Sequence, residues 1–253
     1  MNSRSADIIE VFSSIQGEGL LVGLRQAFLR FSGCNLACAY CDTMEAIPGH
    51  GTEYCRLEKT PGRGDFSLVK NPLLLQDIKP LLDQWLTKHP DSHHSISLTG
   101  GEPLLQVETL LEWLPVLRGF LPIYLETNGI LHESLSKCIN LLDFVSMDVK
   151  LPSTSGIDAL WEKHQLFLSV ASSKQVYVKT VVSDRTEDWE IIKASEIISA
   201  ADRNIPLVIQ PLTGKAGELS ISSLKLLELQ EIASGILREV RIIPQTHRFM
   251  SMI

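Results

Sequence analysis

The sequence predicts an α/β fold in which about six parallel strands form an open, partial barrel. First, short apolar runs of strand length alternate with segments whose apolar residues follow helical spacing. Second, strands that alternate with helices form a parallel sheet, and six or seven such units are too few to close an eight-unit barrel. Third, the unusual polar residues fall directly behind the apolar runs, where parallel-sheet proteins carry their chemistry.

The strands are expected at short apolar runs spread along the chain. They are AFLRF (27–31), SISL (95–98), IYLE (123–126), FVSMD (144–148), VYVKTVV (176–182), LVIQ (207–210) and VRII (240–243). Six of them are followed by a distinctive motif. In order, the motifs are a cysteine-rich loop, TGGEP (99–103), TNG (127–129), VKLPS (149–153), PLTGK (211–215) and PQTHRF (244–249). Because the carboxyl ends of parallel strands meet at one rim, we expect these motifs to form one site.

Residues 44–72 interrupt this alternation. They are rich in glycine, proline and charge and show no apolar period, so we predict a long inserted loop over the site. The rest of the chain continues the strand–helix pattern to its end. We therefore predict a single domain, 1–253, that carries this insertion.

Composition and charge narrow the function classes. The chain has 23 basic and 30 acidic side chains and a net charge of −7, which argues against direct action on tRNA or DNA and favours a small-molecule substrate. No apolar stretch is long enough to span a bilayer, and MNSRSADIIEVFSS at the N-terminus lacks the apolar core of a signal peptide. We expect a cytoplasmic protein with no membrane and no nucleic-acid partner.

Three cysteines lie within eight positions of the segment RFSGCNLACAYCDT, with the spacing Cys34-x3-Cys38-x2-Cys41. Tightly spaced cysteines in a chain of this character are metal ligands or catalytic groups more often than disulfides. A structural zinc site needs a fourth ligand, which His50 or Cys55 would have to supply. A [4Fe–4S] cluster is normally held by four cysteines, so three would leave one iron open for the amine and carboxylate of an amino acid.

At these residues the sequence resembles the radical S-adenosylmethionine (radical SAM) superfamily. The cysteine triplet, the aromatic Tyr40 before its last member and the TGGEP motif carry the resemblance. It implies a [4Fe–4S] cluster on Cys34, Cys38 and Cys41 whose open iron binds the methionyl end of SAM. One electron from the cluster then breaks the S–C5′ bond, and the 5′-deoxyadenosyl radical takes a hydrogen atom from the substrate.

The same resemblance implies a set of SAM contacts behind the strands. They are Tyr40, Asp42, Gly100, Gly101, Glu126, Asp148, Val149, Lys150, Gln210, Pro211, Leu212 and Thr213. For several of these motifs, a purely structural role is the alternative interpretation. TGGEP alone would be a tight strand-to-helix turn in which Glu102 is a structural charge. Asn128-Gly129 alone would be a turn, and Asp148 with Lys150 a solvated ion pair.

Three further segments resemble the 7-carboxy-7-deazaguanine synthase family over nearly the full chain. They are SSIQGEG (13–19), Asp42-Thr43 and RIIPQTHRFM (241–250). The resemblance implies a carbon–nitrogen lyase of the 7-deazapurine pathway toward queuosine. It would convert 6-carboxy-5,6,7,8-tetrahydropterin into 7-carboxy-7-deazaguanine with loss of ammonia, assisted by Mg²⁺. A flavodoxin- or ferredoxin-like electron donor and a homodimer are also implied.

The implied substrate contacts are Ile15, Gln16, Gly17, Glu18, Arg30, Thr99, His247 and the terminal Ile253. Arg30 is expected to bind the substrate carboxylate with both arms of its guanidinium, or else to be a half-buried strand arginine paired internally. Glu18 would pair with the amino and N–H edge of the pterin, or only hold its loop. Thr43 would be a hydroxyl ligand of Mg²⁺, or only cap the turn after Cys41.

Two other functions compete with this reading. One is a radical SAM activase that installs a glycyl radical on a partner protein, which would share the cysteine triplet and GGEP. The other is a non-catalytic zinc module. Cys55 and Cys138 are taken as non-ligands, and Trp85, Trp113, Trp161 and Trp189 as core residues because they lie in helical patterns.

Overall fold

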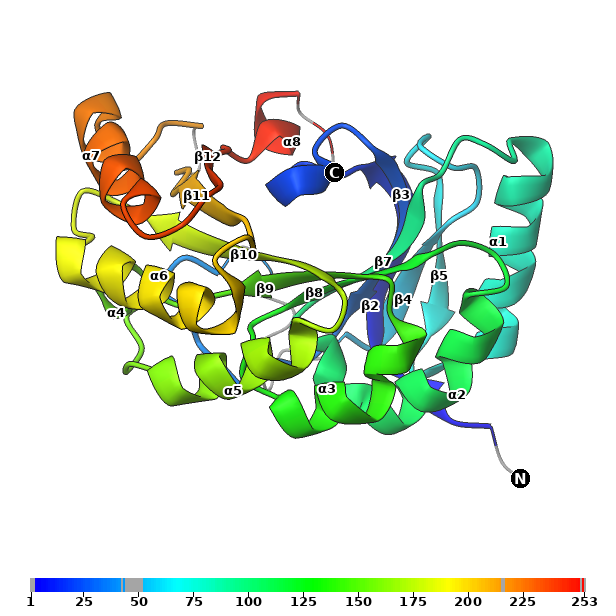
Figure 1. Cartoon of the computed structure of the whole chain (residues 1–253). Coiled ribbons are helices and arrows are strands. Elements are labelled where there is room, and N and C mark those ends of the chain that lie inside the picture. Colours follow the sequence, from blue (N-terminus) through cyan, green and yellow to red (C-terminus); the bar gives the residue numbers. More distant parts are fainter. Residues whose placement is uncertain (1–2, 42, 44–51, 215–216, 251, 253) are drawn as a thin grey trace.

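A single curved sheet is the centre of the protein (Figure 1). The computed structural model describes residues 3–41, 43, 52–214, 217–250 and 252. Within these residues the sheet has ten strands in the order β12-β11-β10-β9-β8-β7-β3-β2-β4-β5. In this spatial order, each strand from β12 to β3 pairs with the next in parallel. They are β3 (Arg25–Phe31), β7 (Ser95–Gly100), β8 (Ile123–Thr127), β9 (Phe144–Asp148), β10 (Gln175–Val182), β11 (Leu207–Pro211) and β12 (Val240–Ile242). The predicted open barrel is confirmed.

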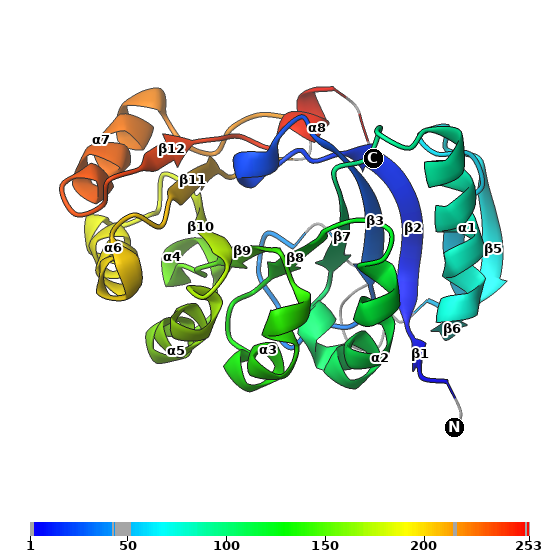
Figure 2. The same cartoon turned by 45° about the vertical axis from the view of Figure 1, so that its right-hand side comes forward.

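Helices cover the outer, convex face of the sheet, while the inner face opens toward the C-terminal segment (Figures 1 and 2). The longer ones are α1 (Leu75–Lys88), α2 (Val107–Leu117), α3 (His132–Cys138), α5 (Trp161–Ala171), α6 (Asp188–Asp202) and α7 (Ser223–Ser234). Short turns of helix are η1 (Gly19–Leu21), η3 (Pro103–Gln106), η4 (Ile139–Leu141), α4 (Pro152–Ser155) and α8 (Thr246–Phe249). Trp85 and Trp113 are core residues as predicted. That prediction is wrong for Trp189, which is 48% exposed and packs edge-on against Trp161.

Side chains alternate between the two faces of the sheet with the period of two that strands impose. In β7 and β8, Leu98 and Leu125 lie opposite each other and belong to the hydrophobic core beneath the helices. The next residues along these strands, Thr99 and Glu126, turn to the inner face instead and line a pocket. The alternation therefore builds a core on one side of the sheet and a polar pocket on the other.

Residues 54–70 are not the loop that we predicted. They form a hairpin of β4 (Tyr54–Glu58) and β5 (Phe66–Lys70), which extends the sheet beyond β2 (Ile8–Ile15). The apolar pattern of β4 is too short to predict a strand from the sequence, because only Cys55 and Leu57 of this strand belong to the core. The strand also pairs with β2 and β5, and the sequence does not display the pairing with the distant β2. A small sheet of β1 (Ser5–Ala6) and β6 (Leu73–Leu74) lies apart.

The carboxylate of Glu58 fixes the hairpin to β2. It is 1% exposed and accepts the backbone N–H of Ser13 at 2.8 Å. It also accepts the three successive backbone N–H groups of the hairpin turn at 62–64, at 2.7–3.0 Å. A buried carboxylate is tolerated when its oxygens are satisfied in this way.

Across the described ranges, no helix combines the length and hydrophobicity that crossing a bilayer requires.

Candidate active site

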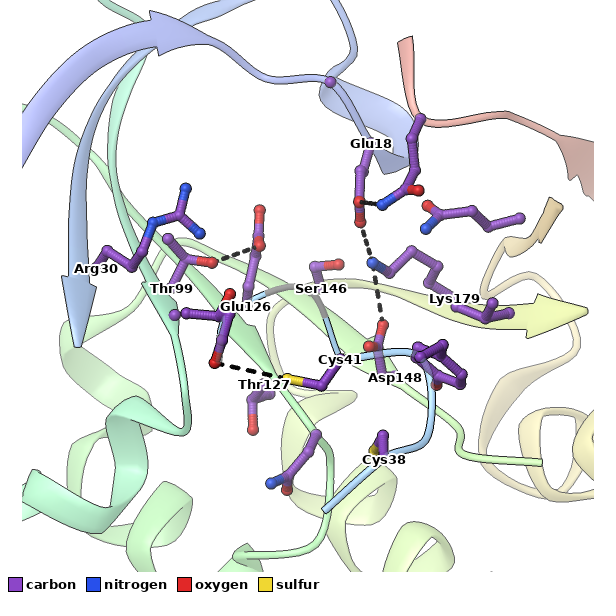
Figure 3. A pocket seen from close by; sticks show the side chains of 18 of the residues that line it. Glu18, Arg30, Cys38, Cys41, Thr99, Glu126, Thr127, Ser146, Asp148 and Lys179 are labelled. Atoms are coloured by element: carbon purple, nitrogen blue, oxygen red, sulfur yellow. Dashed lines mark hydrogen bonds and ion pairs between the residues drawn. The ribbon is translucent and has the colours of Figure 1, made fainter. Parts of the chain in front are cut away.

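A polar pocket lies inside the barrel, at the carboxyl ends of the parallel strands (Figure 3). It collects most of the residues that the sequence singled out. These are Ile15, Gln16, Gly17, Glu18, Arg30, Cys34, Cys38, Tyr40, Cys41, Thr43, Thr99, Gly100, Gly101, Glu126, Asp148, Lys150, Gln210, Leu212, Thr213 and His247. The motifs behind the strands therefore do meet at one rim.

Four predicted contacts are not in the pocket as described. Asp42 and Ile253 lie outside the described residues. Val149 and Pro211 are described but do not line the pocket. The backbone of Val149 is used within the sheet, because its N–H donates to Lys179 O at 2.8 Å and its C=O accepts from Thr180 Oγ1 at 3.0 Å. Its side chain is 1% exposed, so only a backbone rearrangement would free it for a ligand.

The glycines of TGGEP join the cysteine loop to the sheet. The N–H of Gly101 donates to Phe31 O at 2.9 Å, and the N–H of Glu102 donates to Gly33 O at 2.8 Å. Gly100 has φ +105°, and a Cβ there would come within 2.4 Å of Phe31 O. Only glycine allows this approach. The far end of the loop is held by Ala39 N–H, which donates to Ser155 O at 2.8 Å.

Glu102 is a structural charge, as the alternative reading expected. Its side chain is buried and accepts the N–H of Asn128 at 2.8 Å, the N–H of Leu104 at 3.1 Å and the hydroxyl of Thr127 at 3.0 Å. Burial raises the pKa of Glu102 to about 7, against these hydrogen bonds. The carboxylate thus ties the TGGEP turn to the loop that follows β8.

Three thiols, those of Cys34, Cys38 and Cys41, are free and partly exposed in the pocket. Burial raises the pKa of the Cys34 and Cys38 thiols, and ligation to a metal would deprotonate them outright. Among the described residues, no three His, Cys, Asp or Glu side chains converge on a point where they could hold one metal ion. Three free cysteines that line one cavity are donors of the kind that a [4Fe–4S] cluster uses, because its irons each take a separate thiolate.

The zinc alternative loses one of its two candidate fourth ligands. Cys55 is fully buried in the hydrophobic core behind the sheet and does not line the pocket. His50 lies outside the described residues. Cys138 is also a core residue, so the prediction that both remaining cysteines are non-ligands agrees with their positions.

Two buried oxygens in the pocket have no hydrogen-bond partner within the part of the chain that the structure describes. They are Asn128 Oδ1 and Gln210 Oε1. The amide nitrogen of Asn128 donates to Asn35 Oδ1 at 2.8 Å. Orphaned buried acceptors are costly unless a ligand satisfies them. The amine, ribose and adenine groups of SAM are donors of the kind that would.

Four charged side chains form a continuous chain across the pocket, and Figure 3 shows three of them, Glu18, Lys179 and Asp148. The Lys179 ammonium contacts Glu18 and lies 3.4 Å from Asp148, which in turn pairs with Lys150 at 2.6 Å. The Asp148 and Lys150 side chains are only 18% and 10% exposed, so the pair is not the solvated one that the structural reading described. Sequence reasoning missed Lys179, although a lone lysine inside the apolar run VYVKTVV was a signal.

The neighbouring opposite charges keep Glu18 and Lys179 ionised. Burial by itself would raise the pKa of Glu18, but Lys179 outweighs it and holds that pKa at about 2. Burial by itself would lower the pKa of Lys179, but Asp148 and Glu18 raise it well above its ordinary value. Glu18 is therefore an anion and Lys179 a cation throughout the physiological range.

Glu126 lies among the predicted substrate contacts. Its carboxylate accepts from Gln16 Nε2 at 2.6 Å and from Thr99 Oγ1 at 2.7 Å (Figure 3). Burial raises its pKa in spite of the nearby Lys179. The assignment of Glu126 to SAM stays a prediction, and its hydrogen-bond partners are two of the predicted substrate contacts.

The QGEG loop and the C-terminal segment form one structure over the pocket mouth. Glu18 Oε1 accepts from Gln245 Nε2 at 2.6 Å, and Gly17 O accepts from Thr246 N–H at 2.8 Å. Gly19 has φ +64°, and a Cβ there would collide with the Tyr177 hydroxyl at 1.8 Å. The motif therefore needs its glycines for close packing, and Gln245 is a further pocket residue that we had not assigned.

The internal pair predicted for Arg30 is present, and the binding of a substrate carboxylate by this side chain stays a prediction. Its Nε donates to Glu10 Oε1 at 2.8 Å, which is the internal pair, yet its guanidinium also lines the pocket (Figure 3). Other lining residues escaped assignment, and most lie inside strands. They are Phe12, Phe28, Leu36, Thr127, Asn128, Ser146, Lys179, Val181, Gln245 and Arg248.

Comparisons with known proteins agree with this geometry. The Radical SAM superfamily matches residues 29–170. A 7-carboxy-7-deazaguanine synthase of Geobacter sulfurreducens is 53% identical over 253 residues and covers 100% of both chains. One of Methanothermobacter thermautotrophicus is 35% identical over 266 residues and covers 98% of each.

Two solved structures share the fold. The crystal structure of QueE from Escherichia coli has a TM-score of 0.62 at 21% identity, with 96% of this chain and 95% of that chain covered. A radical SAM methyltransferase from Sphaerobacter thermophilus has a TM-score of 0.56 at 13% identity, with 87% and 66% covered. At these identities the likeness concerns the fold alone.

Proposed function

The chain belongs to the 7-carboxy-7-deazaguanine synthase family of radical SAM enzymes, and we propose that it converts 6-carboxy-5,6,7,8-tetrahydropterin into 7-carboxy-7-deazaguanine. The reaction contracts the pterin ring and releases ammonia, so the enzyme is a carbon–nitrogen lyase. One observation carries the proposal. Three free thiols line the same pocket as an anionic and a cationic side chain, Glu18 and Arg30, whose charges would suit the two ends of a carboxylated pterin.

The residues fit the cofactors that this family uses. Cys34, Cys38 and Cys41 would hold a [4Fe–4S] cluster, and the orphaned oxygens of Asn128 and Gln210 would accept hydrogen bonds from SAM. When bound, the cluster and SAM supply hydrogen-atom abstraction by a 5′-deoxyadenosyl radical. The protein's part is to bind and orient both molecules.

The substrate end of the pocket matches the polar edge of a pterin. Glu18, held as a carboxylate by Lys179, can accept from the amino and N–H edge of the ring. Arg30 faces the cavity with its guanidinium and can bind the carboxylate bidentately. Glu126 lines the pocket and burial raises its pKa, so it is a candidate to exchange a proton with the departing nitrogen.

The proposal also includes a metal ion and an electron donor. Thr43, which lines the pocket, would bind Mg²⁺ together with water and substrate oxygens. A flavodoxin- or ferredoxin-like protein would supply the electron. The homodimer, the single-domain organisation and the cytoplasmic location stay predictions, the last supported by free thiols that need a reducing compartment.

An anaerobic assay tests the function. Cluster-loaded protein, SAM, a reductant and 6-carboxytetrahydropterin should yield a product with the ultraviolet spectrum and mass of a deazaguanine acid. The activase alternative, which the relatives do not support, predicts no such product. Metal analysis adds an independent check, because a [4Fe–4S] protein carries about four irons and four sulfides per chain and a zinc module carries neither.

A further inference from the structure

Glu10 lies between two arginines on the inner face of three adjacent strands. Glu10 is the register partner of Arg30 in the antiparallel β2–β3 pair and of Arg56 in the parallel β2–β4 pair. Each carboxylate oxygen takes one partner. Oε1 accepts from Arg30 Nε at 2.8 Å, and Oε2 accepts from Nη2 of Arg56. The outer member, Arg56, comes from the hairpin that the sequence had not revealed.

The three side chains differ in exposure, and this decides how strongly their charges act. The Glu10 side chain is 4% exposed, Arg30 24% and Arg56 52%. A buried carboxylate beside Arg30 is poorly screened by water and would cancel much of the attraction of Arg30 for an anion. Arg56 binds the other oxygen of Glu10. The triad of Glu10, Arg30 and Arg56 therefore carries two positive charges and one negative, a formal sum of +1.

The triad also aims the guanidinium of Arg30. Glu10 holds Nε, while the Arg30 Cζ lies 5.3 Å from the centre of the Phe12 ring, which fixes the plane of the group. The pair with Glu10 uses the Nε edge, and the guanidinium reaches the pocket (Figure 3). This geometry suits a bidentate carboxylate.

We propose that Arg56 determines the affinity of the pocket for carboxylated substrates, because it offsets the charge of Glu10 and leaves Arg30 free to bind the substrate carboxylate. This rests on the proposed function, since it assigns the carboxylate of the pterin to Arg30. It also gives the hairpin a role in specificity although the hairpin lies at the far side of β2 from the pocket.

The hairpin holds Arg56 in a defined place. Glu58 anchors the hairpin turn to β2 through Ser13, and the Arg56 Cζ lies 5.4 Å from the centre of the Phe66 ring on the neighbouring strand. A half-exposed arginine would otherwise have little preference for one rotamer. These contacts favour the position from which it reaches Glu10.

The test measures binding to the cluster-loaded protein with SAM and without reductant, so that no turnover occurs. The variant is Arg56→Gln, and the matched control is Arg63→Gln, an exposed arginine in the turn of the same hairpin. Calorimetry compares 6-carboxytetrahydropterin with tetrahydropterin, which lacks the carboxylate. We expect R56Q to raise the Kd of the carboxylated ligand by about three- to tenfold. The Kd values of tetrahydropterin and SAM should stay within about twofold, as should all values for R63Q.

A charge rescue separates this from a structural role. In the double variant Glu10→Gln with Arg56→Gln, the formal sum returns to +1 and the Gln oxygen can still accept from Arg30 Nε. Its Kd for the carboxylated ligand should recover toward the wild-type value, and Arg56→Lys should lose little. Equal weakening of both ligands in R56Q, or no recovery in the double variant, would overturn the proposal. If the wild type itself neither binds nor converts the carboxylated pterin, the proposed function fails instead.

Discussion

The imidazole of His247 lies directly against the backbone of Gly17. A Cβ at position 17 would come within 2.1 Å of His247 Nδ1 and within 2.5 Å of its Cβ. The backbone N–H of Thr246 donates to Gly17 O at 2.8 Å beside this contact. Two segments from opposite ends of the sequence therefore close the same side of the pocket, and their fit requires the absence of a side chain at Gly17.

Replacing Gly17 by alanine should displace His247 from the pocket mouth. We expect the KM for the pterin to rise about tenfold or more with a small effect on unfolding, because most residues of the displaced segment are only partly buried. Steady-state kinetics and denaturant unfolding measure the two quantities. The double variant G17A/H247G should be no worse than H247G alone, because glycine at position 247 removes the Cβ, Cγ and Nδ1 atoms that the new methyl group would meet. A much larger loss in the double variant would show that Gly17 serves another purpose.

Replacing Lys179 by methionine should leave Glu18 and Asp148 as buried carboxylates without their shared cation. Breaking a buried ion pair by removing one partner costs about 3–5 kcal/mol. We therefore expect a loss of that order in the free energy of unfolding, together with a fall in kcat/KM. Adding Glu18→Gln to K179M removes one stranded charge, so urea titration should show recovered stability but activity should stay low. Stability unchanged in K179M would contradict the burial of this charge chain.

Removing any one of the pocket thiols should abolish turnover. Alanine at Cys34, Cys38 or Cys41 is expected to lower iron and sulfide content and to eliminate the brown colour, because each thiolate holds part of the cluster. Cys138→Ser and Cys55→Ala supply matched controls from the core. They should cost about 1–3 kcal/mol of stability and leave the iron content unchanged. Activity in a cluster-thiol variant would refute the assignment.

Two buried histidines should make the fold sensitive to mild acid. Burial lowers the pKa of His93 to about 4 and that of His164 to about 4, against an ordinary value of 6.5. The unfolded chain then binds more protons than the folded one between these values. Stability is fully present above pH 6.5 and falls as the pH drops toward 4, by up to about 1.4 kcal/mol per pH unit for each histidine.

Urea unfolding at pH 7.5 and pH 5.5 measures this dependence. The variants His93→Gln and His164→Gln should each flatten the pH profile while lowering stability at pH 7.5. His93 is the cleaner case, since its partners are the hydroxyls of Ser13 and Ser92 and no pocket residue. A profile that runs parallel to the wild type in H93Q would exclude His93 as a source.

His164 has a second role that the sequence did not suggest. Its Nε2 accepts the N–H of Lys150 at 3.2 Å, and its Nδ1 lies 3.0 Å from Gly129 O. The neutral ring with its proton on Nδ1 satisfies both partners, so one imidazole fastens the loops behind β8 and β9 to helix α5. A lone histidine at helical spacing does not reveal this, because its partners are backbone groups of other loops.

The sequence by itself determined what depends on neighbours along the chain. Each parallel strand was recognisable as an apolar run, and the cysteine spacing and the glycines of TGGEP marked their site because the chemistry needs them within a few residues. What only the tertiary structure decided are the pairings between distant strands. Lys179 meets Glu18 across 161 positions, and Arg56 meets Glu10 across 46. A strand pattern says that a side chain faces one side of a sheet or the other, but the strand order and register choose its partner. Contact with that distant partner is what distinguishes Lys179 or Arg56 from an ordinary lysine or arginine.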